Sequence, residues 1–133
     1  MKMKSIITAG LLLIAIAVQA QQTQGLLDGK KFSIQLMKGG TLDSKETIVF
    51  DQGMMDPLDC HQYGFTAAKY EGKNSNGMFT WRSVSKSDKE GTMSWQGEIT
   101  GDKIEGNVSW TKEGQAPINY TFKGTTAVVK SDK

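Results

Sequence analysis

The residues best suited to chemistry lie close together in the segment 52–63, QGMMDPLDCHQY. It contains Asp56, Asp59, Cys60 and His61. A cysteine with a histidine can form a nucleophile pair, and a histidine with aspartate or cysteine can ligate a metal. His61 is the single histidine of the chain, and a zinc site needs three or four ligands. Neighbours in an extended segment point to opposite sides, so we do not expect Cys60 and His61 to converge on one atom.

This segment therefore predicts no catalytic residue, no metal site and no cofactor, and we expect a protein that is not an enzyme. An enzyme or redox protein that uses Cys60 and His61 remains the alternative. Cys60 is the single cysteine, so it cannot form a disulfide within the chain. It is either a small buried apolar residue, a reactive sulfur or a link between two chains. Cys60, His61 and Tyr63 together remain a candidate reactive or partner-binding site.

The clearest structural element is a predicted β-hairpin over residues 92–111, TMSWQGEITGDKIEGNVSWT. Apolar residues and glycines alternate with polar residues in both arms, so one face is expected to meet a core and the other solvent. Gly101-Asp102 lies between the arms, and a glycine at the first central position suits a type II′ turn. This loop predicts the following facing pairs: Thr100 and Lys103, Ile99 and Ile104, Glu98 and Glu105, Gly97 and Gly106, Trp95 and Val108, Met93 and Trp110.

Further strands are expected over 30–37, 45–51, 64–71, 78–84 and 118–124, with 125–129 extending the last of them. The segments 52–63 and 85–91 read as irregular and as a charged loop. About eight short strands without a helical period predict an all-β fold. Sequential hairpins favour an antiparallel up-and-down barrel of the lipocalin or avidin type, and a β-sandwich is the alternative.

The N-terminal residues predict export. Residues 1–20 contain Lys2 and Lys4, an apolar stretch and a small-residue site ending at Ala20, as in a secretory signal peptide. We expect a lead-in over 21–28, one barrel domain over 29–129 and a polar tail over 130–133. The two signal lysines account for the whole formal charge of +2, so no basic patch predicts nucleic-acid binding. We expect a periplasmic or extracellular protein of a Gram-negative bacterium, without a membrane span once the signal is removed.

The hairpin motif resembles a known family. The run Trp95-x-Gly97-x-Ile99-x-Gly101-Asp102-x-Ile104-x-Gly106-x-Val108-x-Trp110 is similar to the late hairpins of small secreted bacterial lipocalin-like, or calycin-type, barrels. The segment 60–65 also resembles uncharacterised secreted bacterial proteins with this pattern. The resemblance implies a closed antiparallel barrel whose interior can take a small apolar or amphipathic molecule, and it implies no established activity.

Aromatic residues on inward strand faces are the candidate ligand site. Gly97 and Gly106 would face each other beside them, and they allow either strong curvature, filling by an indole, or room for a ligand. The candidate ligand-binding residues are Trp81, Trp95, Gly97, Gly106, Trp110, Tyr120 and Phe122. We expect an exported, non-enzymatic barrel that binds a small apolar or amphipathic molecule inside. The alternative is an envelope interaction module with a filled core, which contacts a protein or glycan through residues 52–63.

Overall fold

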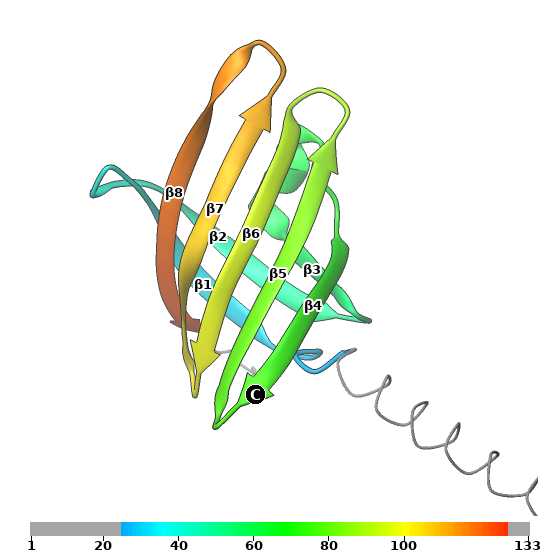
Figure 1. The fold of residues 1–133 in the computed structure, drawn as a ribbon, viewed down its shortest axis with the longest axis vertical. Coiled ribbons are helices and arrows are strands. Elements are labelled where there is room, and N and C mark those ends of the chain that lie inside the picture. Colours follow the sequence, from blue (N-terminus) through cyan, green and yellow to red (C-terminus); the bar gives the residue numbers. More distant parts are fainter. Residues whose placement is uncertain (1–24, 128–133) are drawn as a thin grey trace, which may run out of the picture.

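The computed structural model describes residues 25–127, which form one closed antiparallel barrel in the order β1 to β8, with β8 paired to β1 (Figure 1). The predicted signal peptide and the tail over 130–133 lie outside the described residues. The barrel prediction is confirmed, and the sandwich alternative is not what forms. The strands are β1 (Lys31–Lys38), β2 (Thr41–Asp51), β3 (Met54–Pro57), β4 (Ala68–Ser75), β5 (Met78–Ser87), β6 (Gly91–Thr100), β7 (Lys103–Lys112) and β8 (Gln115–Thr126).

The central hairpin forms with the predicted register. Gly97 faces Gly106 and Trp95 faces Val108 on the inner side, and Glu98 faces Glu105 on the outer side. Gly101 has a φ of 62°, the left-handed conformation that the first central residue of a type II′ turn requires. A slip of one residue would send the inner side chains of one arm to solvent, so the alternation itself holds this register.

Several segments differ from the sequence prediction: β2 begins at Thr41 rather than at 45, and β8 at Gln115 rather than at 118. Residues 54–57 form β3, and residues 58–63 form a 3₁₀ helix, η3 (Leu58–Tyr63), where an irregular segment was expected. The strand expected over 64–71 is β4, which lies four residues later. β5 continues to Ser87 into the predicted charged loop, because its serines alternate inward and pair with β6 up to Gly91.

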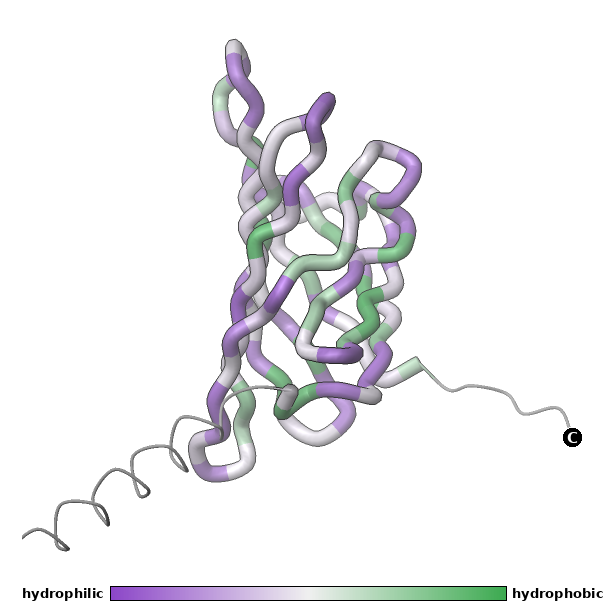
Figure 2. The backbone as a smooth tube through the Cα atoms, turned by 90° about the vertical axis from the view of Figure 1, so that its right-hand side faces the viewer, coloured by the Kyte–Doolittle hydropathy of each residue, from purple (hydrophilic) through white to green (hydrophobic). Residues whose placement is uncertain are grey.

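Alternation along the strands creates the core. Hydrophilic and hydrophobic residues follow each other along the tube in Figure 2, as strands with one buried face require. In Figure 1, β4–β8 face the viewer and β1–β3 cross behind them. The lower end is closed by Leu27, which is 0% exposed and whose N–H donates to the Tyr70 hydroxyl at 2.7 Å. Residues 25–28, assigned to a lead-in from the sequence, therefore take part in the barrel.

The upper end is closed by η3, at the weakest seam of the barrel. The ladder between β3 and β4 has two pairs, Met54 with Lys69 and Met55 with Ala68. η3 follows β3 directly and contacts β2. Within residues 25–127, no helix is long and apolar enough to cross a membrane.

Candidate functional site

The lower interior is filled with aromatic rings. Phe50 meets Tyr70 and Trp81 edge-on, with ring centroids 5.0 and 5.1 Å apart. Phe122 lies 6.2 Å from Trp81 and 5.6 Å from Trp95. Edge-to-face packing at these separations is favourable beyond simple burial. Three of the predicted ligand-binding residues, Trp81, Trp95 and Phe122, are therefore core residues in this conformation.

The rings also occupy the room beside the two facing glycines. A Cβ atom on Gly97 would lie 3.1 Å from Cε2 and Cζ2 of Trp81, and one on Gly106 would lie 2.8 Å from Cζ of Phe122. Backbone atoms approach even closer at Gly106. The sequence left curvature, filling by an indole and ligand space open for these glycines. In the structure an indole and a phenyl ring fill the space.

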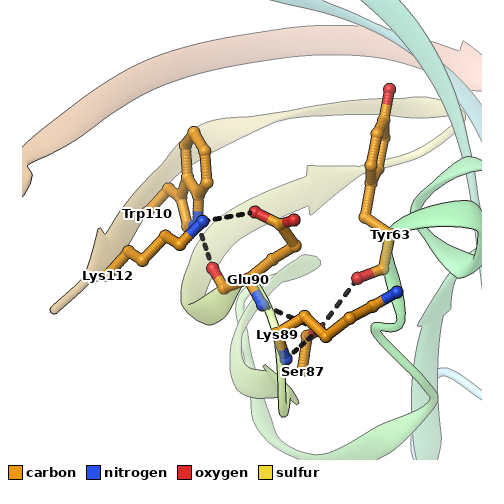
Figure 3. A network of polar contacts seen from close by, with 6 residues as sticks. All are labelled: Tyr63, Ser87, Lys89, Glu90, Trp110 and Lys112. Carbon is orange, nitrogen blue, oxygen red and sulfur yellow. Dashed lines mark hydrogen bonds and ion pairs between the residues drawn. The ribbon is translucent and has the colours of Figure 1, made fainter.

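The upper interior is polar along β5. Ser83, Ser85 and Ser87 are all buried on its inner face. The Ser83 hydroxyl donates to the carbonyl of Lys69 at 2.8 Å. The Ser87 hydroxyl donates to the carbonyl of Tyr63 at 2.8 Å and accepts the N–H groups of Lys89 and Glu90 (Figure 3). Ser87 thus ties the end of η3 to β5.

Three buried polar atoms of the described residues have no hydrogen-bond partner: Nε1 of Trp81, Nε1 of Trp95 and Oγ of Ser85. Leaving such a group unpaired costs about 1–3 kcal/mol. Trp95 faces Ser83 across the β5–β6 ladder, and Ser85 is the next inward residue on β5. Two of the three atoms therefore belong to side chains at neighbouring positions on the inner face.

Glu46 holds η3 against β2. Its side chain is 3% exposed, and its Oε2 accepts the N–H of Asp59 at 2.6 Å and that of Thr47 at 3.1 Å. The Cys60 thiol donates to Oε1 at 3.1 Å. Burial raises the pKa of the Glu46 carboxyl, while the hydrogen bonds from Asp59 and Cys60 partly oppose that rise.

Cys60 and His61 engage different carboxylates and do not converge. Cys60 is buried, and burial raises the pKa of its thiol, with the Glu46 carboxylate adding to the effect. Since the thiolate is the nucleophile, this environment disfavours reaction at the sulfur. His61 Nε2 lies 2.6 Å from Asp56 Oδ1. The expected extended backbone is wrong here, because both residues lie in η3.

Metal ligation has no support in the part of the chain that the structure describes. No group of three or more histidine, cysteine, aspartate or glutamate side chains lies close enough there to hold an ion. The closest reactive pairs are His61 with Asp56 and Cys60 with Glu46. Each pair is better explained as a contact that shapes the η3 segment.

At the upper ends of β7 and β8, the side chains on the inner face are only partly buried. Trp110, Ile118 and Tyr120 are partly buried there. The indole N–H of Trp110 donates to the Glu90 carbonyl, and Lys112 Nζ lies 3.0 Å from the Glu90 carboxylate (Figure 3). Burial raises the pKa of the Tyr120 hydroxyl, and Asp43 and Cys60 act in the same direction. We call Trp110, Ile118 and Tyr120 the rim.

Cross-strand rows connect the rim to the unpartnered atoms. One row runs from Ser85 through Met93 to Trp110 and Ile118. The row below runs from Ser83 through Trp95 and Val108 to Tyr120. Residues in facing positions on one side of a sheet have Cβ atoms about 4.5–5.5 Å apart. The rim and the upper interior therefore form one continuous surface.

Outside the barrel, an open groove of about 1230 Å³ crosses the outer face of β4–β8. Outward-pointing polar side chains line most of it, including Lys69, Arg82, Glu98 and Lys123. The interior itself is packed, since the inward residues of the core are almost fully buried. A molecule that enters the barrel must therefore displace a closing segment.

Glu46 and Ser85 were missed by the sequence analysis, although a signal for both existed. Glu46 precedes Ile48 and Phe50 at the spacing of two residues that marks one strand face. Ser85 stands at the same spacing from Ser83 and Ser87. Polar residues in such positions were assigned to solvent or to a loop because apolar residues are the usual sign of an inner face.

The fold and the site define a closed eight-stranded antiparallel up-and-down barrel, compatible with a lipocalin-like fold, with a packed aromatic base and a polar upper interior. No family model matches the chain, and neither does a curated protein or a solved structure.

Proposed function

We propose that this protein is an exported, non-enzymatic barrel of the lipocalin-like type that binds a small amphipathic molecule through its upper end. The observation that carries this proposal is the rim: Trp110, Ile118 and Tyr120 lie on the inner face but are only partly buried. Aromatic and aliphatic side chains of this kind line most small-molecule sites. Below them lie buried polar atoms that could orient a ligand.

The way in is through η3. The strands are held by ladders of backbone hydrogen bonds, whereas η3 is held chiefly by side-chain contacts from Glu46 and Ser87. Segments with few ladder hydrogen bonds open at lower free energy than the strands around them. Displacement of η3 would open the upper interior to solvent without breaking the barrel.

Export rests on the N-terminal residues. Lys2, Lys4, the apolar stretch and the site at Ala20 have the order of a signal peptide. We therefore place the mature protein in the periplasm or outside a Gram-negative cell, with a small ligand as its partner and without nucleic acid or a membrane span. Protein sequencing of the mature N-terminus from the native host tests this, since a chain that keeps Met1 would contradict export.

A titration followed by tryptophan emission tests binding. The neutral probes 1-decanol and Nile red should change the emission saturably, and Ile118→Asp should weaken both by about tenfold or more, because it places a charge on the apolar rim. The matched control is Val84→Asp, an exposed residue on the outer face of β5, which should leave binding unchanged. Unchanged emission with every probe would refute the proposal.

A second candidate function is an envelope interaction module that acts through residues 52–63 on a protein or glycan. It is favoured by Tyr63, which is 53% exposed at the end of η3. Exposed tyrosines are common anchors of interfaces. Tyr63→Ala should then abolish capture of the partner from an envelope extract, while Ile118→Asp should not. Loss of capture in the rim variant alone would reject this alternative.

A further inference from the structure

The unpartnered atoms of Trp95 and Ser85 specify the chemistry of a ligand. An indole N–H can only donate a hydrogen bond, and a serine hydroxyl can donate one as well. Trp95 is 1% exposed and Ser85 is 0% exposed, so solvent does not satisfy either group directly. We propose that Trp95 Nε1 and Ser85 Oγ together bind the oxygen of a neutral carbonyl group, a ketone, ester or amide, on an otherwise apolar ligand. This rests on the function proposed above.

The two donors come from diagonally neighbouring positions on the inner face. Trp95 faces Ser83, and Ser85 lies two residues further along the same face of β5. Such diagonal neighbours have Cα atoms about 7–8 Å apart, which is within reach of a long aromatic side chain. Ser83 and Ser87 already donate to backbone carbonyls. Ser85 is therefore the β5 serine whose hydroxyl is available to a ligand.

The charges around the donors favour a neutral ligand group. Among the described residues, the buried polar or charged side chains are Glu46, Ser83, Ser85 and Ser87, and no lysine or arginine is among them. A carboxylate would therefore enter without a counter-charge, which is strongly unfavourable in a buried site. Glu46 already accepts three hydrogen bonds, from Asp59, Thr47 and Cys60.

The ligand then has a defined orientation. Its carbonyl group points inward to Trp95 and Ser85, and its apolar part lies along the two rows that lead to Trp110, Ile118 and Tyr120. The indole N–H of Trp110 is already bound to the Glu90 carbonyl, so this residue offers the ligand its ring alone. Trp95 and Trp110 therefore have different roles although both are tryptophans on the inner face.

Three probes of the same shape test the proposal on the purified protein. Acetophenone has a carbonyl, α-methylstyrene replaces that oxygen with a methylene group, and benzoate carries a charge. The readouts are the dissociation constants and the indole N–H signals in ¹⁵N–¹H spectra, assigned by tryptophan-to-phenylalanine variants. Acetophenone should bind about fivefold to tenfold more tightly than α-methylstyrene, the factor that one neutral hydrogen bond supplies. It should also bind more tightly than benzoate and move the Trp95 signal downfield.

Two variants and one control separate the donors from the rim. Trp95→Phe and Ser85→Ala should each remove most of the preference for acetophenone over α-methylstyrene. Trp110→Phe, the control, should change the affinity for both probes by the same factor. If Trp95→Phe does not fold, Ser85→Ala and the comparison of probes on the unaltered protein still decide the question.

Each outcome has one meaning. Equal affinity for acetophenone and α-methylstyrene, with an unmoved Trp95 signal, would overturn the carbonyl assignment and leave the binding function standing. Tightest binding of benzoate would overturn the requirement for a neutral group. Absence of binding by acetophenone, α-methylstyrene, 1-decanol and Nile red would refute the proposed function itself.

Discussion

Glu46 is the residue on which the upper end of the barrel most depends. Its buried carboxyl accepts hydrogen bonds from Asp59, Thr47 and Cys60, so one side chain of β2 holds three groups, two of them in η3. A carboxylate removed from water is less stable than one in solvent, and its hydrogen bonds offset only part of that cost. The contact that closes the barrel is therefore sensitive to protonation.

The first prediction concerns the pH dependence of this contact. The pKa of Glu46 is raised in the folded protein above its ordinary value of 4.5. Protonation therefore stabilises the folded state, so the contribution of Glu46 is most favourable below about pH 4.5 and declines as the pH rises through the folded pKa. Urea unfolding of the unaltered protein and of Glu46→Gln measures this contribution. As the pH is lowered from 7 to 4.5, the free energy of unfolding of the unaltered protein should rise relative to that of the variant. A difference that moves the other way would contradict the raised pKa.

The second prediction concerns the Cys60 thiol. Because burial and the Glu46 carboxylate raise its pKa, iodoacetamide at pH 7 should modify the folded protein at least about 100-fold more slowly than the protein in urea. Glu46→Ala should accelerate the reaction, since it releases η3. Rapid labelling of the unaltered protein would instead favour an enzyme or redox protein that uses Cys60 and His61.

At the scale of the elements, the central hairpin contains two facing glycines, Gly97 and Gly106. Because they have no side chains, the backbone of the facing strand and an aromatic ring lie close to each of them. A Cβ atom on Gly106 would lie 2.1 Å from the carbonyl oxygen of Gln96 and 2.6 Å from Cα of Gly97. The neighbours of Gly97 are less close, at 2.8 Å from the Glu105 carbonyl oxygen and 3.1 Å from the Trp81 ring. Backbone atoms in a paired strand cannot move aside as a flexible side chain can.

The third prediction follows from these distances. Gly106→Ala should lower the free energy of unfolding by about 3 kcal/mol or more, because overpacking against backbone has no inexpensive relief. Gly72→Ala on β4 is the matched control, since the nearest backbone atom lies 3.2 Å from its Cβ position, and it should cost less than about 1 kcal/mol. Chemical denaturation of both variants makes the comparison. Equal losses would show that the close approach in the hairpin is relieved by a shift of the strands.

The same elements show how far sequence reasoning reaches. The hairpin register could be predicted residue by residue because tryptophans, glycines and β-branched residues alternate there without interruption. The upper part of β5 was missed because Ser85 and Ser87 are inward residues of a type that usually faces solvent. The candidate aromatic set was found, but its division into the buried Trp81, Trp95 and Phe122 and the partly buried Trp110 and Tyr120 depends on strand tilt and on η3, which sequence periodicity does not contain.

On the scale of the whole molecule, the barrel is closed at its two ends by different means. At the lower end Leu27 is buried, and the Tyr70 hydroxyl donates to Asp28 Oδ1 at 2.9 Å. Burial raises the pKa of Tyr70 to about 12, so its hydroxyl stays a donor throughout the neutral range. The lower closure thus combines a buried leucine with hydrogen bonds of the Tyr70 hydroxyl, whereas the upper closure depends on a buried carboxyl.

The fourth prediction concerns the lower closure. Leu27→Ala should lower the free energy of unfolding by about 2–5 kcal/mol, the usual cost of a cavity at a fully buried leucine. Leu26→Ala, at a neighbouring residue that is 36% exposed, should change it by less than about 1 kcal/mol. Thermal and urea unfolding followed by circular dichroism measure both. Similar small losses would mean that residues 25–28 are only a lead-in to the barrel.

The pairing of β1 with β8 has a consequence for how the protein is made. β1 ends at Lys38 and its partner β8 begins at Gln115. The hydrogen bonds between β1 and β8 can therefore form only after the last of the eight strands has been synthesised. Contacts between such distant parts of a chain slow folding and postpone it. A ribosome that has released only seven of these strands holds a sheet with two unprotected edges, and the barrel can close only after β8 has emerged. For the export proposed above, such a delay would leave the growing chain unfolded while it is threaded through a translocation pore.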